Sequence, residues 1–151
     1  MKTKVETYTY PNGKKKRETP YVNGQKHGIE TWWHISGQKR YETPYVNGQI
    51  HGLETYWYPN GHKRGEIPYI NGQRHGIATW WHENGQNRYE IPYVNGKQHG
   101  IETWWYSDGF LYFVTKWHQD QKVWEMNFSS QEQISENAKV KLFFHEKPEL
   151  I

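Results

Sequence analysis

The sequence predicts an all-β protein, an elongated and twisted single-layer antiparallel meander of β-hairpin repeats with atypical ends. The first observation is a fixed step of 24 residues, with no insertion, between the glycines Gly13, Gly37, Gly61, Gly85 and Gly109. The second is the same step between the Asn-Gly pairs that begin at Asn23, Asn47, Asn71 and Asn95. A fixed period of this size is typical of repeat proteins, and Asn-Gly between strand-like runs predicts a tight hairpin.

The elements follow in order along a single repeat domain, 1–151. Residues 1–13 form an N-terminal half repeat, because 5–13 aligns with 29–37, and residues 14–109 form four full repeats. In the first repeat two strands, about 15–22 and 28–35, flank the hairpin turn at Asn23-Gly24, and Ser36-Gly37 forms the next turn. The whole chain then has about ten strands and no parallel pairing.

The last part of the chain departs from the repeat. Residues 110–128 form a degenerate copy in which Asp120 takes the position of the turn glycine, and 129–151 form a C-terminal cap. Within that cap, Ser129 and Glu132 fit a capping box for a short helix, and 139–145 alternate as a final strand would. Terminal repeats are usually atypical because they cap the stack.

Strand alternation predicts two different faces if both turns of a repeat contain two residues. Val22 would then pair with Gln25, Pro20 with His27 and Glu18 with Ile29. One face would carry Ile29, Thr31 and Trp33 with Lys16, Glu18, Pro20 and Val22. The other face would carry Glu30, Trp32 and His34 with Arg17, Thr19 and Tyr21. Arg40 is expected opposite Trp33, where a cation–π contact could form.

Composition narrows the class of protein. Nine Trp and twelve Tyr raise the aromatic fraction to 17%, although the mean hydropathy is −1.14. Trp and Tyr must therefore supply most of the buried area, at about 150–250 Å² each. Cysteine is absent and no stretch of 18 apolar residues or secretory signal is evident, so we expect a cytoplasmic protein. The basic run 14–17 is interpreted as a solvated strand edge, because the net charge of +3 is otherwise evenly mixed.

Repeated polar residues do not predict catalysis or a metal site. The equivalent histidines His27, His51, His75 and His99 would lie about 9.6 Å apart, twice the interstrand distance, which is too far for neighbours to share a zinc ion. We expect them to order the hairpin turn. The repeated Glu18, Glu42, Glu66 and Glu90 lie along one face with no cleft, so charge pairing is the expected role. We expect no catalytic residues, no metal and no cofactor.

The segment Tyr21-Val22-Asn23-Gly24-Gln25-Lys26-His27-Gly28, followed by an aromatic pair and the turn glycine Gly37, resembles the MORN repeat. It is closer to the bacterial MORN variant than to the general MORN repeat, and the resemblance covers about 5–128. This resemblance implies an elongated single-layer sheet without intrinsic catalysis. It also implies an antitoxin-like role, in which the protein neutralises a partner by binding it, whereas eukaryotic MORN proteins suggest scaffolding, dimerisation or phospholipid contact.

Three hypotheses about function therefore stay open. The first is a non-catalytic antitoxin or immunity protein that binds a protein partner, such as a cognate toxin. The second is an aromatic face that stacks single-stranded nucleic acid, a nucleotide or a carbohydrate. The third is a lipid-associated or scaffolding protein, and a second copy of the chain is a further candidate partner.

The predicted binding surface is the face that mixes large rings with Glu30, Glu54 and Glu102, as protein interfaces do. Its predicted members are Trp32, Tyr56, Trp80 and Trp104, flanked by Tyr21, Tyr45, Tyr69 and Tyr93. The second tryptophan of each aromatic pair shares its face with Ile29, Val22 and Pro20, and is assigned to packing. Those tryptophans are Trp33, Trp57, Trp81 and Trp105.

Overall fold

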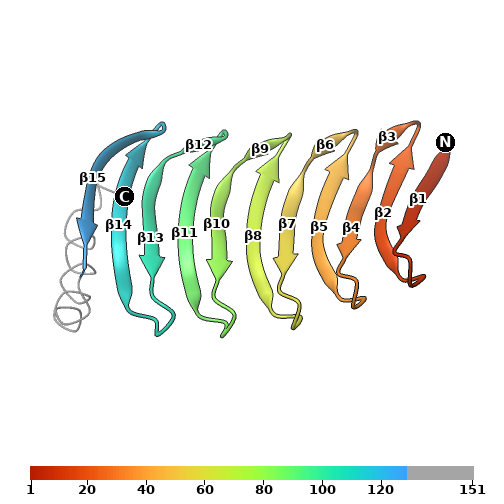
Figure 1. The fold of residues 1–151 in the computed structure, drawn as a ribbon. Helices are drawn as coiled ribbons and strands as arrows, with labels where there is room; N and C mark the ends of the chain where they lie inside the picture. The colour runs from red at the N-terminus through yellow and green to blue at the C-terminus, as the bar shows by residue number, and fades with distance from the viewer. Residues whose placement is uncertain (129–151) are drawn as a thin grey trace.

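The computed structural model describes residues 1–128 and shows one open antiparallel sheet, in which consecutive long strands lie side by side from β1 to β15 (Figure 1). Eleven strands follow one another across the sheet: β1 (Thr3–Thr9), β2 (Lys15–Val22), β4 (Gly28–Trp33), β5 (Lys39–Val46), β7 (Gly52–Trp57), β8 (Lys63–Ile70), β10 (Gly76–Trp81), β11 (Asn87–Val94), β13 (Gly100–Trp105), β14 (Leu111–His118) and β15 (Gln121–Asn127). Four two-residue strands extend the hairpins: β3 (Gln25–Lys26), β6 (Gln49–Ile50), β9 (Gln73–Arg74) and β12 (Lys97–Gln98).

This architecture confirms the predicted single-layer antiparallel meander. The capping box at Ser129 and the final strand at 139–145 lie outside the described residues. Over 1–128 the structure contains no helix, and hence none that is long and apolar enough to cross a membrane.

The hairpin turns adopt the conformation that Asn-Gly predicts. Asn23 has φ 51° and Gly24 has φ 82°, and the other Asn-Gly pairs are nearly identical. Positive φ at both central residues is the mark of a type I′ turn, which matches the twist of the two strands. In the degenerate copy Gln119 and Asp120 take these positions with φ 54° and 64°, which confirms the predicted place of Asp120.

A bulge follows each hairpin turn and shifts the predicted register. Val22 pairs with Gln25 as predicted, but Glu18 pairs with Thr31 and not with Ile29. Gly28, with φ 101°, allows the bend, and Pro20 opposite it has no N–H to contribute to the ladder. The shift is two residues, so the side chains of β4 keep their predicted faces.

The second turn of each repeat is wider than predicted. The amide of His34 donates to the carbonyl of Gln38 at 2.8 Å, so three residues lie in the loop. The register then shifts so that Trp33 pairs with Lys39 and Trp32 with Tyr41. The prediction that Arg40 stands opposite Trp33 is therefore wrong.

Arg40 is the extra residue of this bulge, and bulged residues do not follow simple alternation. Its guanidinium lies 6.0 Å from the ring centre of Tyr41, and the equivalent Arg64 lies 5.7 Å from that of Trp80. Lys16 is the bulged residue of the first repeat and lies 5.7 Å from the ring centre of Tyr10, so its predicted place beside Trp33 is also wrong. The cation over Trp33 is Lys15, at 5.5 Å.

The two faces of the sheet differ in burial. The ring face carries Trp32 and Tyr41, and its centre is closely packed. The buried residues of that centre are Thr19, Glu30, Thr43, Glu54, Ile67, Ala78, Glu102 and Thr115, each 7% exposed or less. The proline face carries Pro20 and Trp33, and its Ile29 is 54% exposed. A small apolar cluster of Leu111, Val114 and Phe128 packs at the β15 end of the sheet.

Hydrogen bonds join each hairpin turn to the next repeat. The amide of Gly48 donates to the carbonyl of Lys26 at 2.8 Å, and Gly72 and Gly96 repeat the contact. Nδ1 of His27 accepts from the amide of Asn47 at 3.4 Å. The histidine therefore contacts the turn of the following repeat, and not the turn that precedes it.

Candidate functional site: the ring face

A continuous row of stacked rings crosses the ring face, one from almost every long strand. The row consists of Trp32, Tyr41, Tyr56, Trp80, Tyr89, Trp104 and Phe113, with centroid separations of 4.2–5.8 Å and interplanar angles of 15–36°. Arg17 extends the row, because its guanidinium lies 4.1 Å from the ring centre of Tyr8 and 5.3 Å from that of Trp32. Cross-strand ring pairs of this kind stabilise a sheet directly.

The row passes over Gly65, the one position in it without a side chain. A Cβ atom at Gly65 would lie 2.6 Å from the ring of Trp80, far inside van der Waals contact. The missing side chain lets Trp80 reach Tyr56, and their ring centres are 5.2 Å apart. Gly65 therefore keeps the stack continuous.

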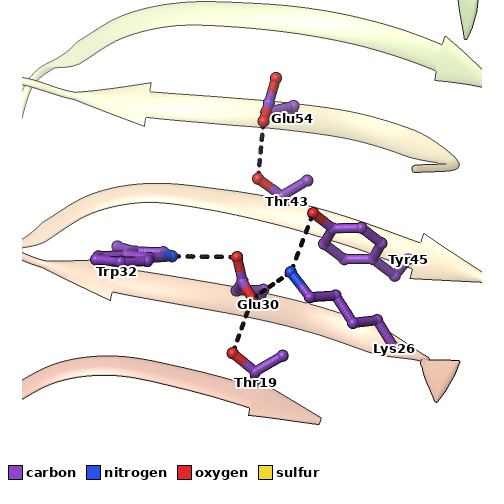
Figure 2. Close-up of polar contacts among 7 residues, drawn as sticks. All are labelled: Thr19, Lys26, Glu30, Trp32, Thr43, Tyr45 and Glu54. Atoms are coloured by element: carbon purple, nitrogen blue, oxygen red, sulfur yellow. Dashed lines mark hydrogen bonds and ion pairs between the residues drawn. The ribbon is translucent and has the colours of Figure 1, made fainter. Parts of the chain in front are cut away.

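Beneath the rings, glutamate and threonine alternate along the buried centre of the ring face. The hydroxyl of Thr19 donates to Glu30 at 2.8 Å, and Thr43 donates to Glu54 at the same distance (Figure 2). Glu30 also accepts from Trp32 Nε1 at 3.1 Å and pairs with Lys26 at 2.8 Å. At the other end of the sheet, Glu102 accepts from the indoles of two tryptophans, Trp104 and Trp117.

These contacts determine how the buried groups ionise. Burial alone would raise the pKa of Glu30, but the hydrogen bonds from Lys26, Thr19 and Trp32 outweigh it and hold that pKa below 4.5. Burial raises the pKa of Tyr56 well above its usual range, and the charge of Glu54 adds to the effect. Glu30 is therefore a buried carboxylate with its partners satisfied, so it is not available to a ligand.

A second row on the ring face alternates phenols with polar or basic side chains near the hairpin turns. Lys26 lies 4.6 Å from the ring centre of Tyr45 and 3.5 Å from its hydroxyl oxygen (Figure 2). Arg74 donates to the hydroxyls of Tyr69 at 3.4 Å and Tyr93 at 3.2 Å. This row forms the other margin of the buried centre.

All eight predicted binding residues lie on the ring face. Trp32, Tyr56, Trp80 and Trp104 belong to the stacked row, and Tyr21, Tyr45, Tyr69 and Tyr93 belong to the phenol row. The structure does not bring the two rows into one cleft, and every one of these side chains is only half-buried. Whether they bind a partner stays a prediction.

Sequence reasoning missed other members of the row and misread its charge. Tyr41 and Tyr89 complete the stack. The predicted two-residue turn already places Tyr41 opposite Trp32, as the wider loop and its bulge also do, so this signal was present in the sequence. The ring face was expected to expose the charges of Glu30, Glu54 and Glu102, but each of these residues is 6–7% exposed. The exposed charge beside the stacked row comes instead from the bulge arginines, Arg40, Arg64 and Arg88.

The histidine row does not form a metal centre within 1–128. No group of three or more His, Asp or Glu side chains in that part of the chain is placed to hold an ion. His51 Nδ1 lies 3.4 Å from the amide of Asn71 and 3.2 Å from its side-chain oxygen, so the ring is engaged with the next turn.

Comparison with known proteins agrees with the repeat pattern. The family described as "MORN repeat variant" matches four consecutive segments, residues 2–23, 26–47, 50–71 and 74–95. No curated protein matches the chain.

Proposed function

Because this chain belongs to the MORN repeat variant family, whose repeats form binding or scaffolding modules, we propose that it is an antitoxin or immunity protein. It neutralises a protein partner by binding it, without catalysis of its own. The partner is a bacterial toxin in the cytoplasm, and the contact is made by the ring face.

The observation that carries this proposal is the continuous row of seven stacked rings, from Trp32 to Phe113, on a sheet with no second layer over it within 1–128. Tryptophan and tyrosine dominate binding hot spots because they bury a large area with few rotatable bonds. The row is pre-organised by its own stacking, so little side-chain entropy is lost when a partner covers it.

MORN repeats bind proteins or lipids, and the ring face favours a protein. Its centre consists of hydrogen-bonded Glu and Thr side chains beneath half-buried rings. A lipid-inserting surface needs exposed apolar side chains. On this sheet the exposed aliphatic side chains Ile29, Leu53 and Ile77 lie on the proline face.

Two adjacent tryptophans on opposite faces provide the test. The full chain would be used to capture its partner from the native host, and the captured protein would be titrated against Trp80→Ala and Trp81→Ala. Trp80→Ala should weaken binding by about 2 kcal/mol or more, whereas Trp81→Ala should leave affinity near the wild-type value. Thermal melts identify the temperature range in which both variants are folded.

The opposite result would place the contact on the proline face. A second experiment tests the antitoxin role. The captured protein should arrest growth when it is expressed alone, and co-expression of this chain should restore growth. A partner that is harmless by itself would make this chain a scaffold and not an antitoxin.

A further inference from the structure

The basic residues of each repeat divide between the two faces. On the proline face, Lys15, Lys39 and Lys63 each form an ion pair with the glutamate three residues later. The next residue along the chain, at the bulge, is Lys16, Arg40, Arg64 or Arg88. Within 1–128 none of these four forms an ion pair with a carboxylate, and all are exposed.

The arginines of this set lie beside the stacked rings. Arg64 is 5.7 Å from the ring centre of Trp80 and 5.8 Å from that of Tyr58, and Arg88 is 5.9 Å from that of Tyr89. Equivalent residues of successive repeats are about 9.6 Å apart, because each repeat adds two strands to the sheet. The margin of the ring row therefore presents a regular line of positive charge.

The stacking also determines which part of each ring a partner can reach. Every ring between Trp32 and Phe113 has a neighbouring ring on both sides, at interplanar angles of 15–36°. The ring faces, which carry the negative part of the quadrupole, are occupied by this packing. The accessible edges carry the positive part.

We propose that the line of Lys16, Arg40, Arg64 and Arg88, together with the ring edges beside it, binds an acidic surface of the protein partner. This inference rests on the proposed function and names the chemistry of the partner. The guanidinium groups bind carboxylates through paired N–H donors, and the ring edges add weaker attraction to the same oxygens. The charges on the partner should follow the same spacing of about 9.6 Å.

Single-stranded nucleic acid fits this surface less well. Non-specific binding of single strands depends on bases that stack on open aromatic faces. Here the faces of the inner rings are closed by their neighbours, so a base could stack only at an end of the row. The carboxylates of a folded protein need no open ring face.

Two triple variants of the full chain test the proposal. Arg40→Gln/Arg64→Gln/Arg88→Gln removes three bulge charges, and Lys15→Gln/Lys39→Gln/Lys63→Gln removes three ion-paired charges from the proline face. The probes are a labelled polyglutamate peptide of about 20 residues, long enough to span several repeats, and an oligothymidylate of about 20 nucleotides. Each is titrated at low and at physiological salt, with melts to confirm folding.

Wild-type protein should bind polyglutamate more tightly than oligothymidylate. The arginine variant should lose affinity for polyglutamate by about tenfold, since three exposed charge pairs contribute about 1–2 kcal/mol together. The lysine variant should lose less than about twofold.

Equal losses in the two variants would show that only net charge matters and would overturn the proposal. Tighter, arginine-dependent binding of oligothymidylate would replace the acidic protein with nucleic acid. A captured protein that needs Trp80 but is indifferent to the arginines would overturn this inference and leave the proposed function standing. Arginine-dependent polyglutamate binding without any protein partner would overturn the proposed function and leave the arginine line as a site for acidic ligands alone.

Discussion

The centre of the ring face differs between the strands β8, β10 and β11 and the strands on either side of them. From β2 to β7 it consists of Thr19, Glu30, Thr43 and Glu54, joined by hydrogen bonds from hydroxyl to carboxylate. Across β8, β10 and β11 the same positions hold Ile67, Ala78 and Ile91, and Ile67 and Ala78 are 5% and 3% exposed. The backbone pairing is the same in both regions, since Glu54 pairs with Ile67 and Ala78 with Ile91.

This fold accepts either a hydrogen-bonded centre or an apolar one. Both satisfy the rule that a buried polar group needs a partner. The exchange extends to neighbouring positions. Lys26 pairs with Glu30, but Arg74, at the equivalent position, has Ala78 in place of the glutamate and donates to phenol hydroxyls. In the third repeat the cation therefore contacts phenols where no carboxylate is present.

The largest effect should come from the third repeat, where Gly65 makes room for Trp80. Gly65→Val would place a side chain within 2.6 Å of the indole and force the ring out of the stack. We expect a loss of about 3 kcal/mol in the free energy of unfolding, as for overpacking of a rigid site. Chemical denaturation followed by near-ultraviolet circular dichroism would measure the stability and the state of the rings.

A double-mutant cycle gives the control for this prediction. If the cost arises from the indole, Gly65→Val should be much less destabilising when Trp80→Ala is already present. Additive losses would show that Gly65 is needed for the backbone of β8 and not for the ring row.

The next largest effect should come from breaking one hydrogen bond in the polar region. Thr43→Val keeps the shape of the side chain but removes the hydroxyl that donates to Glu54 at 2.8 Å. The loss of one hydrogen bond to a buried carboxylate should cost about 2 kcal/mol. Adding Glu54→Ala, which reproduces the apolar chemistry of Ile67 and Ala78, should recover part of that loss in the same denaturation assay. A double variant less stable than Thr43→Val alone would contradict the idea that the two centres are interchangeable.

The sequence predicted the fold well because its strongest signals are local. Asn-Gly sets the hairpin turn through two residues that tolerate positive φ, and this gave the meander and the place of Asp120. The bulges were not predictable in the same way. Pairing of Glu18 with Thr31 depends on Gly28 bending opposite Pro20, which is a contact between strands.

The candidate site was only partly predictable for the same reason. The 24-residue period showed which tryptophans share a face, but not which polar residues beside them are covered. Glu30 is buried because Lys26, Thr19 and Trp32 surround its carboxylate, which is a property of three strands together. Arg64 is a bulged residue, so the face on which its side chain lies does not follow from strand alternation. The exposed charge beside the stacked rings could therefore not be predicted from the sequence.

Replacing Lys26, the cation that pairs with Glu30, should change how the free energy of unfolding depends on pH. In the wild type the pKa of Glu30 is held below 4.5, so its contribution is present above that value and is lost as the pH falls through the lowered pKa. In Lys26→Met, burial would dominate and raise the pKa of Glu30. We expect a deficit of about 1–2 kcal/mol at pH 7 that shrinks towards zero once the pH lies below the lowered pKa that Glu30 has in the wild type. A deficit of the same size at both pH values would point to lost packing of the lysine stem over Tyr45.

The smallest effect should come from the proline face, where the fourth repeat lacks the ion pair of the first three. Asn87 replaces the lysine found at Lys63, and its amide donates to Glu90 at 3.2 Å. Burial raises the pKa of Glu90, so the folded state favours its protonated form, and stability from this group is lost as the pH rises through the raised value.

Asn87→Lys should lower that pKa and add about 0.5 kcal/mol to the free energy of unfolding at pH 7, with no gain near pH 3, where Glu90 is protonated. Lys63→Asn is the matched control, because it removes the ion pair with Glu66, and it should cost a similar amount at pH 7. Denaturation at the two pH values and an NMR titration of Glu90 would measure these changes, and an unchanged pKa for Glu90 would show that its burial outweighs any nearby cation.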